Sequence, residues 1–134
     1  MPAMTARDLL DRLTDPQVAV FDCRFLLEAP DAGRQEYLQA HVPGATYVHL
    51  DEDLSAAPTG RNGRHPLPEP SAIVSRFGRL GISNDNDVVV YDSAGGGLAA
   101  SRLWWMLRYL GHDRGSILDG GWPAWLQAGG PARG

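Results

Sequence analysis

The sequence predicts an α/β fold in which an open parallel sheet carries helices on both faces. Three short apolar runs each end at an aspartate, and they cover residues 18–22, 88–92 and 116–119. Runs this short, bounded by polar residues or Gly, are typical of strands that are buried on both faces. Because helical segments separate these strands, we expect the strands to run parallel. A fourth, weaker strand is predicted over residues 45–48.

Helical segments occupy the intervals, and several have a recognisable start or stop. Thr5 followed by Asp8 resembles a capping box at the start of a first helix with leucines at helical spacing. A glycine directly after a helical pattern predicts its end, as Gly81 and Gly111 do here. The remaining helices are predicted over residues 33–40, 70–80, 98–110 and 123–128.

The whole chain, residues 1–134, is expected to form one domain with a core from about residue 5 to residue 129. Its 134 residues, 43% hydrophobic and 21% charged, have the size and composition of a single soluble domain. A stretch rich in Pro, Gly and Arg predicts a long irregular loop over residues 51–69. The single cysteine, Cys23, excludes an internal disulfide and a four-cysteine zinc site.

Charge and hydropathy argue against several classes of partner. A net charge of −4 disfavours nucleic acid, which prefers a basic face. No apolar run reaches about 18 residues, so no membrane span is expected. The polar start of the chain does not resemble a secretory signal, and we therefore expect a cytoplasmic protein. All twelve basic residues are arginine, which excludes a Schiff-base lysine and a P-loop lysine.

No metal and no cofactor are expected. The adjacent carboxylates Asp51, Glu52 and Asp53 are typical of a solvated loop. His49 and His65 have no metal-ligand spacing around them.

The loop after residue 91 combines a strand end, three glycines and a helix start. Successive glycines let backbone N–H groups converge, and a helix N-terminus adds partial positive charge. The loop is therefore either an anion cradle or a flexible connection. It lacks the lysine of a P-loop and the glycine spacing of a dinucleotide site, which argues against ATP and NAD. Its residues are Asp92, Ser93, Ala94, Gly95, Gly96 and Gly97.

Five motifs follow one another along the chain at domain-wide spacing. They are Asp-Cys-Arg at 22–24, His-Val-Pro-Gly-Ala at 41–45, Val-Val-Tyr-Asp at 89–92, Arg-Leu-Trp-Trp-Met-Leu at 102–107 and Leu-Asp-Gly-Gly-Trp-Pro-Ala-Trp at 118–125. Together they resemble the rhodanese family, and more closely the first domain of the two-domain thiosulfate and 3-mercaptopyruvate sulfurtransferases. The resemblance extends from about residue 18 to residue 129. It implies a five-stranded parallel sheet with flanking helices in a single domain.

The resemblance also implies a chemistry that this chain lacks. In the second, catalytic domain of these proteins the loop begins with a cysteine, whose thiolate takes up a sulfane sulfur as a persulfide and passes it to cyanide or a thiol acceptor. This chain has Asp92 at that position. A carboxylate has no sulfur, so the domain is expected to be inactive by itself. Its expected partner is a second rhodanese domain, C-terminal in the same parent chain. A small sulfur donor is expected to bind only when that second domain is present.

Asp92 is predicted to act as an internal anion that accepts hydrogen bonds from Ser93 and from the amides of residues 95–97. Cys23 is expected to be a half-buried small hydrophobe rather than a nucleophile.

Two other functions remain open. An inactive rhodanese-like domain could act alone as a regulatory or protein-binding module. Asp92 could instead act as a nucleophile or phosphoryl acceptor. Such sites need further carboxylates for Mg²⁺ and a lysine, and the chain has no lysine.

The resemblance suggests that Asp31, His41 and Arg102 line an interdomain cleft. In the 3-mercaptopyruvate branch, a histidine and an aspartate of the first domain are proposed to relay a proton with a serine of the second. His41 matches that histidine, and Asp31 is the nearest upstream candidate for the aspartate. An imidazole is suited to proton transfer at neutral pH. The alternative is that His41 only bonds to backbone at the turn before Pro43.

Two further pairs have structural interpretations. Arg24 is expected to form an ion pair with Asp22 that orders the strand end, in preference to positioning an anion. Trp104 and Trp105 are adjacent on a helix and cannot face the same side. One is expected to pack on the sheet, and the other to be an exposed anchor for a partner surface.

Overall fold

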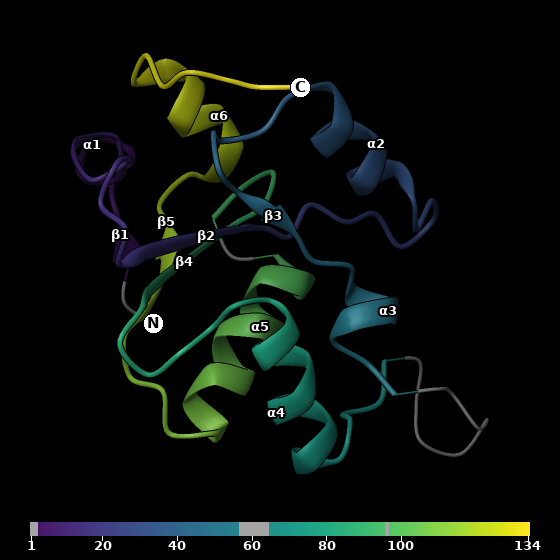
Figure 1. Ribbon diagram of the computed structural model, residues 1–134. Coiled ribbons are helices and arrows are strands. Elements are labelled where there is room, and N and C mark those ends of the chain that lie inside the picture. The colour runs from purple at the N-terminus through teal and green to yellow at the C-terminus, as the bar shows by residue number, and fades with distance from the viewer. Residues whose placement is uncertain (1–2, 57–64, 96) are drawn as a thin grey trace.

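The computed structural model describes residues 3–56, 65–95 and 97–134. Its centre is a sheet of five parallel strands in the order β1-β5-β4-β2-β3 (Figure 1), which confirms the predicted fold class. The strands are β1 (Ala3–Met4), β2 (Val18–Asp22), β3 (Thr46–Tyr47), β4 (Asp87–Tyr91) and β5 (Gly115–Leu118).

The two central strands, β2 and β4, pair over five residues, from Val18 opposite Asp87 to Asp22 opposite Tyr91. Four consecutive side chains of β4, residues 88–91, are buried, as expected for a strand covered on both faces. The strands expected from apolar runs lie within two residues of the observed ends. Strand β1 was not predicted, because two residues carry no periodic pattern.

Helices cover both faces of the sheet (Figure 1). Helices α4 and α5, with the short α3, lie on one face, whereas α1 and α6 lie on the other and α2 lies toward the β3 edge. Alternate strand residues divide between two apolar clusters: Val88 and Val90 belong to the first face, and Val89 and Tyr91 to the second. The helices are α1 (Ala6–Asp11), α2 (Ala32–Gln39), α3 (Leu50–Asp53), α4 (Pro70–Arg79), α5 (Leu98–Tyr109) and α6 (Gly121–Gln127).

The local signals for helix ends are confirmed. The Thr5 hydroxyl accepts a hydrogen bond from the Asp8 amide at 3.1 Å, so Thr5 caps α1. Gly81 and Gly111 follow α4 and α5 with φ of +79° and +86°, a left-handed conformation that favours glycine. Helix α6 begins at Gly121, two residues earlier than predicted.

The irregular loop predicted over residues 51–69 instead begins inside helix α3. His49 caps this helix, because its Nδ1 accepts hydrogen bonds from the amides of Asp51 and Glu52 at 3.1 and 3.3 Å. The acidic run therefore lies in a helical first turn, where negative charge is favourable. Residues 57–64 of the predicted loop lie outside the described residues.

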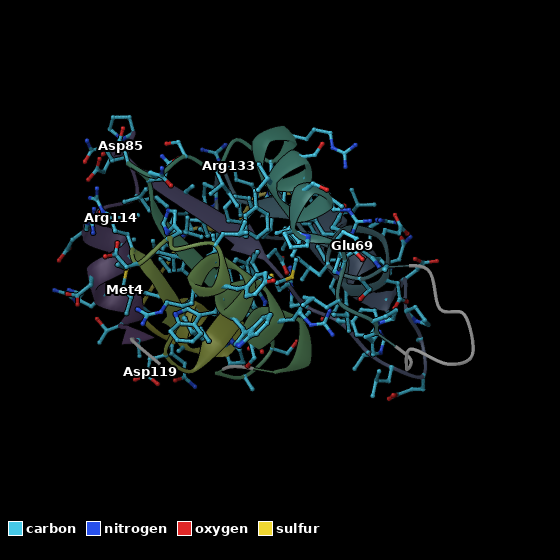
Figure 2. All side chains as sticks on the ribbon, turned by 90° about the horizontal axis from the view of Figure 1, so that it is seen from below. Met4, Glu69, Asp85, Arg114, Asp119 and Arg133 are labelled. Carbon is cyan, nitrogen blue, oxygen red and sulfur yellow. The ribbon has the colours of Figure 1, made fainter. Side chains whose placement is uncertain are left out.

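Figure 2 shows the molecule from below, with Met4 on the β1 edge and Glu69 next to α4 on opposite sides. None of the helices in the described ranges combines the length and apolarity needed to cross a membrane.

Candidate functional site

The Asp92 loop connects β4 to α5 at the carboxyl edge of the sheet, where open α/β folds place their ligands. The Asp92 side chain is buried and accepts backbone hydrogen bonds from the described part of its loop. One carboxylate oxygen bonds to the amide of Ala94 at 2.9 Å, and the other to the amide of Gly97. Gly97 is the N-cap of α5, so the carboxylate lies at a helix N-terminus. The negative charge of Asp92 thus lies against backbone amides of the loop and of the helix start.

These bonds agree in part with the expected donors. Gly97 donates as predicted, and Ala94 donates in addition. Gly96 lies outside the described residues. The other loop residues, Ser93 and Gly95, are exposed.

The first turn of α6 holds the other side of the Asp92 loop. The amide of Trp122 donates to the Asp92 carbonyl at 2.8 Å. A Cβ atom on Gly121 would lie 2.1 Å from the Ala94 carbonyl oxygen, so only glycine permits this approach. Gly121 also has φ of +61°. The sequence reasoning missed this role, although two glycines between a strand end and a helix are a signal of close backbone approach.

Cys23 lies on the floor of the same region. Its amide donates to the Tyr91 carbonyl at 2.7 Å, and with Asp92 and Phe25 it lines a cavity of about 140 Å³. Its side chain is 1% exposed, so the expectation of a half-buried residue was wrong in degree. Burial, and then the charges of Asp22 and Asp92, raise the pKa of the Cys23 thiol well above its ordinary value. The raised pKa favours the protonated thiol over the nucleophilic thiolate.

Arg24 and Asp22 form a buried ion pair beside the loop. The guanidinium contacts both carboxylate oxygens, with Nη2 at 2.7 Å, and Nη2 also donates to the Ala40 carbonyl at 2.6 Å. The Tyr91 hydroxyl donates to Asp22 at 2.8 Å and accepts from the Val42 amide. Burial and the Asp22 carboxylate raise the pKa of Tyr91 well above its ordinary value. These contacts favour the structural interpretation of Arg24 over anion binding.

His41 lies at the turn after α2, and its side-chain partner is a backbone carbonyl. Its Nδ1 is 2.7 Å from the carbonyl oxygen of Tyr37, and the two rings stack with centroids 3.9 Å apart. Asp31, the expected partner, lies beside His49, whose Nε2 is 3.4 Å from the Asp31 carboxylate. In this structure the Asp31 carboxylate therefore lies against His49 and Arg34, and the hydrogen bond of His41 Nδ1 goes to Tyr37 instead.

Asp31, His49 and Glu52 bring one side-chain ligand atom each within 4.8 Å of one another. The sequence reasoning missed this group, because Asp31 is far from the other two residues along the chain. The group does not fit a metal ion. His49 Nδ1 accepts two amide hydrogens, so the proton of the neutral ring is on Nε2, the atom that a metal would need. Arg34 also pairs with both carboxylates, at 3.6 and 2.8 Å.

The Arg102 side chain bonds to backbone carbonyls and does not point to an open surface. Its guanidinium donates to the Leu54 carbonyl at 2.9 Å and to the His65 carbonyl. Burial lowers the pKa of Arg102. Arg102 therefore contacts the backbone at Leu54 and at His65. These contacts give no support to its expected place in a cleft wall.

A cavity of about 370 Å³ is lined in part by Ser55, Ala56 and His65, from the two segments that Arg102 contacts. His65 Nδ1 lies 3.0 Å from the Asp51 carboxylate within it. The lining residues are Phe25, Leu27, Pro30, Asp51, Ser55, Ala56 and His65.

The two adjacent tryptophans of α5 face different surroundings, as predicted. Trp104 packs toward β5, and its Nε1 donates to the Gly115 carbonyl at 3.1 Å. Trp105 is 46% exposed and stacks on Tyr109 with ring centroids 5.2 Å apart.

Comparison with known families gives a match to the rhodanese-like domain over residues 5–128, nearly the whole chain. The chain belongs to the rhodanese-like domain family. The resemblance seen in the five sequence motifs is therefore confirmed.

Relatives of this rhodanese-like domain are sulfurtransferases by name. The chain is 44% identical over 128 residues to a probable 3-mercaptopyruvate sulfurtransferase of Pseudomonas aeruginosa. The aligned region covers 94% of this chain and 45% of that relative. It is 38% identical over 117 residues to a thiosulfate sulfurtransferase of Bos taurus, covering 87% of this chain and 38% of that protein.

Solved structures give the same result. The 3-mercaptopyruvate sulfurtransferase of Leishmania major superimposes with a TM-score of 0.90 at 30% identity, over 98% of this chain and 36% of that one. SseA from Escherichia coli, a 3-mercaptopyruvate sulfotransferase, superimposes with a TM-score of 0.80 at 30% identity, over 98% of this chain and 50% of that one. The rhodanese-like domain thus spans between 36% and 50% of the length of these four relatives.

Proposed function

We propose that this chain is the non-catalytic rhodanese-like domain of a thiosulfate or 3-mercaptopyruvate sulfurtransferase and that it transfers no sulfur by itself. Its partner on this proposal is a second rhodanese domain of the same parent chain. The observation that carries the proposal is the Asp92 carboxylate, bonded to the amides of Ala94 and Gly97 at the N-terminus of α5.

The chemistry of sulfur transfer needs a thiolate at that point. With thiosulfate as donor, the thiolate attacks the outer sulfur, the sulfur–sulfur bond breaks, and sulfite leaves with the bonding electron pair. The product is a persulfide, which a cyanide or thiol acceptor then attacks. A carboxylate oxygen at residue 92 cannot hold sulfur in this way. The same loop amides that would stabilise a thiolate instead stabilise the charge of Asp92.

Cys23 does not substitute for the missing nucleophile. It is the only thiol of the chain, it is 1% exposed, and its raised pKa keeps it protonated. The donor would have to enter the core to reach it. On this proposal Cys23 packs against the sheet and takes no part in sulfur transfer.

The role proposed for this domain is to form one wall of an interdomain cleft. Leu26 and Leu27 are about half exposed, next to Phe25, which lines the cavity at the Asp92 loop. Half-exposed leucines beside a polar loop suit a surface that another domain covers. A cytoplasmic location is part of the same proposal.

A stand-alone protein-binding module is the second candidate function. The exposed stack of Trp105 on Tyr109 favours it, because such aromatic pairs are good anchors for a partner surface. The open reading frame that encodes the chain distinguishes the two: a continuation into a second rhodanese domain supports the first proposal, and a stop directly after residue 134 supports the second.

The deciding experiment combines a thiosulfate:cyanide assay with mass spectrometry of the purified chain after incubation with thiosulfate. We expect no thiocyanate and no added mass on the unaltered chain or on Cys23→Ala. The variant Asp92→Cys, made in the Cys23→Ala background, is expected to gain about 32 Da, the mass of one sulfur atom. Sulfur uptake by the unaltered chain that persists in Cys23→Ala would overturn the proposal.

A further inference from the structure

We propose that Tyr37 is the positioning residue of His41, and that it holds the imidazole with Nδ1 protonated and Nε2 available as a proton acceptor. The use of His41 in a sulfurtransferase rests on the proposed function, but the geometry that supports the positioning does not. A carboxylate is the partner usually expected for such a histidine. Here the partner is a backbone carbonyl of the preceding helix.

The hydrogen bond determines which ring nitrogen carries the proton. The Tyr37 carbonyl oxygen can only accept, so His41 Nδ1, 2.7 Å away, must be the donor. In the neutral ring Nε2 then keeps its lone pair. Among the described residues, no hydrogen bond engages Nε2, and the His41 side chain is partly exposed. The ring is thus arranged to accept a proton from outside the domain.

Tyr37 holds the ring through two further contacts. Its own ring lies nearly parallel to that of His41, with centroids 3.9 Å apart and 14° between the planes. Its hydroxyl donates to the Ala45 carbonyl at 2.6 Å, on the far side of the turn that contains His41. Tyr37 therefore contacts the imidazole twice, through its carbonyl at Nδ1 and through its ring on one face. Its hydroxyl in turn anchors it to Ala45 at the end of the turn.

The backbone of His41 is held independently. Its amide donates to the Arg133 carbonyl at 2.7 Å, and its carbonyl accepts from the Arg133 amide at 2.9 Å. The main chain is thus set by the C-terminal segment, and the ring orientation by Tyr37. Asp31 contributes to neither, because its carboxylate lies against His49 and Arg34.

The proton acceptor that results differs from one backed by a carboxylate. A carbonyl sets the tautomer and the orientation of the ring, but it carries no negative charge to stabilise the imidazolium that forms after proton uptake. His41 is therefore suited to accept a proton briefly and pass it on. The groups that could supply the proton are a thiol or hydroxyl of a substrate or of a partner domain.

Nitrogen-detected NMR of the histidine rings tests the proposal, since protonated and unprotonated ring nitrogens have well-separated frequencies. In the unaltered chain we expect His41 as the Nδ1–H tautomer and His49 as the Nε2–H tautomer. Tyr37→Phe keeps the ring and the carbonyl, so it should keep the His41 pattern. Tyr37→Ala removes the stack and the anchor, and should give averaged His41 nitrogens.

The His112 signals report in the same spectrum whether each variant is folded, because its Nε2 lies 3.0 Å from the Ser83 carbonyl and its Nδ1 accepts from the Arg114 amide. Asp31→Asn is the matched control that should leave His41 unchanged. An Nε2–H tautomer of His41 in the unaltered chain would overturn the proposal. So would a folded Tyr37→Ala variant with the original His41 pattern, or an Asp31→Asn variant that loses it. Sulfur uptake by the chain would overturn the proposed function and leave this assignment standing.

Discussion

Arg24 and Asp22 form an ion pair whose side chains are 3% and 0% exposed, with Nη2 2.7 Å from a carboxylate oxygen. The pair connects the end of β2 to the C-terminus of α2, because Arg24 also bonds to the carbonyl of Ala40, the C-cap of that helix. Its guanidinium lies over the ring of Trp122, 4.7 Å from the centroid. A charge pair this deeply buried is strongly sensitive to the loss of either partner.

Arg24→Met should therefore lower the free energy of unfolding by about 3–5 kcal/mol, because it leaves the Asp22 charge buried and unpaired. Urea denaturation at pH 7 measures the change. The matched control is Arg34→Met, which removes an exposed pair with Glu52 and should lower the free energy of unfolding by less than about 1 kcal/mol. Equal losses in the two variants would contradict the importance given to burial.

Gly121→Ala should destabilise the domain more than Gly111→Ala does. Both glycines have positive φ, so both substitutions strain the backbone. A Cβ at residue 111 meets nothing within 4 Å, whereas a Cβ at residue 121 would lie 2.1 Å from the Ala94 carbonyl oxygen. We expect an additional loss of about 1–3 kcal/mol from this overlap. Thermal melts of the two variants give the comparison, and indistinguishable melting temperatures would show that α6 and the Asp92 loop can separate freely.

Asp92→Ala should destabilise the chain and create an anion site. The amides of Ala94 and Gly97 would lose their acceptor, which costs about 1–3 kcal/mol for these partly buried hydrogen bonds to a charged group. The vacated space at the helix N-terminus should then bind sulfate or thiosulfate. We expect sulfate to raise the melting temperature of the variant more than that of the unaltered chain. Sodium chloride at the same ionic strength is the control, and an equal effect of sulfate on both proteins would rule out the cradle.

Asp87→Asn should weaken the domain at neutral pH and flatten its acid unfolding curve. The hydrogen bond from Arg12, at 2.5 Å, and then that from Arg114, at 2.8 Å, lower the pKa of Asp87. A carboxyl group whose pKa is lower in the folded than in the unfolded state stabilises the folded state at any pH above its unfolded pKa. The contribution is lost as the pH falls through the folded pKa.

The free energy of unfolding of Asp87→Asn and of the unaltered chain is measured between pH 7 and about pH 2. The two values should differ by about 1 kcal/mol at pH 7 and converge in acid. Asp85→Asn is the control, since it removes an exposed carboxylate at the same margin of the molecule, where Figure 2 labels Asp85 and Arg114. A constant difference between Asp87→Asn and the unaltered chain across this range would contradict the assignment.

The fold could be predicted from the sequence because its signals are local. Short apolar runs that end at Asp22 and Asp92 indicated buried strands, and Thr5 and Gly111 indicated where helices begin and end. Each of these signals depends on a few neighbouring residues and on the period of the backbone. The position of Asp92 at a strand end, before a glycine loop and a helix, likewise follows from order along the chain.

The partners of the site residues were decided only by the tertiary structure. Asp31 lies ten positions before His41, yet packing places it against His49, and His41 bonds instead to a carbonyl of the preceding helix, α2. Arg102 turns to two loop carbonyls rather than to an open surface. The contacts of Asp31 and Arg102 join segments distant in the sequence, and they depend on where helices settle on the sheet and on which polar groups are buried there. Residue patterns determine the elements and their order, but the competition among buried donors and acceptors is resolved only when those elements pack.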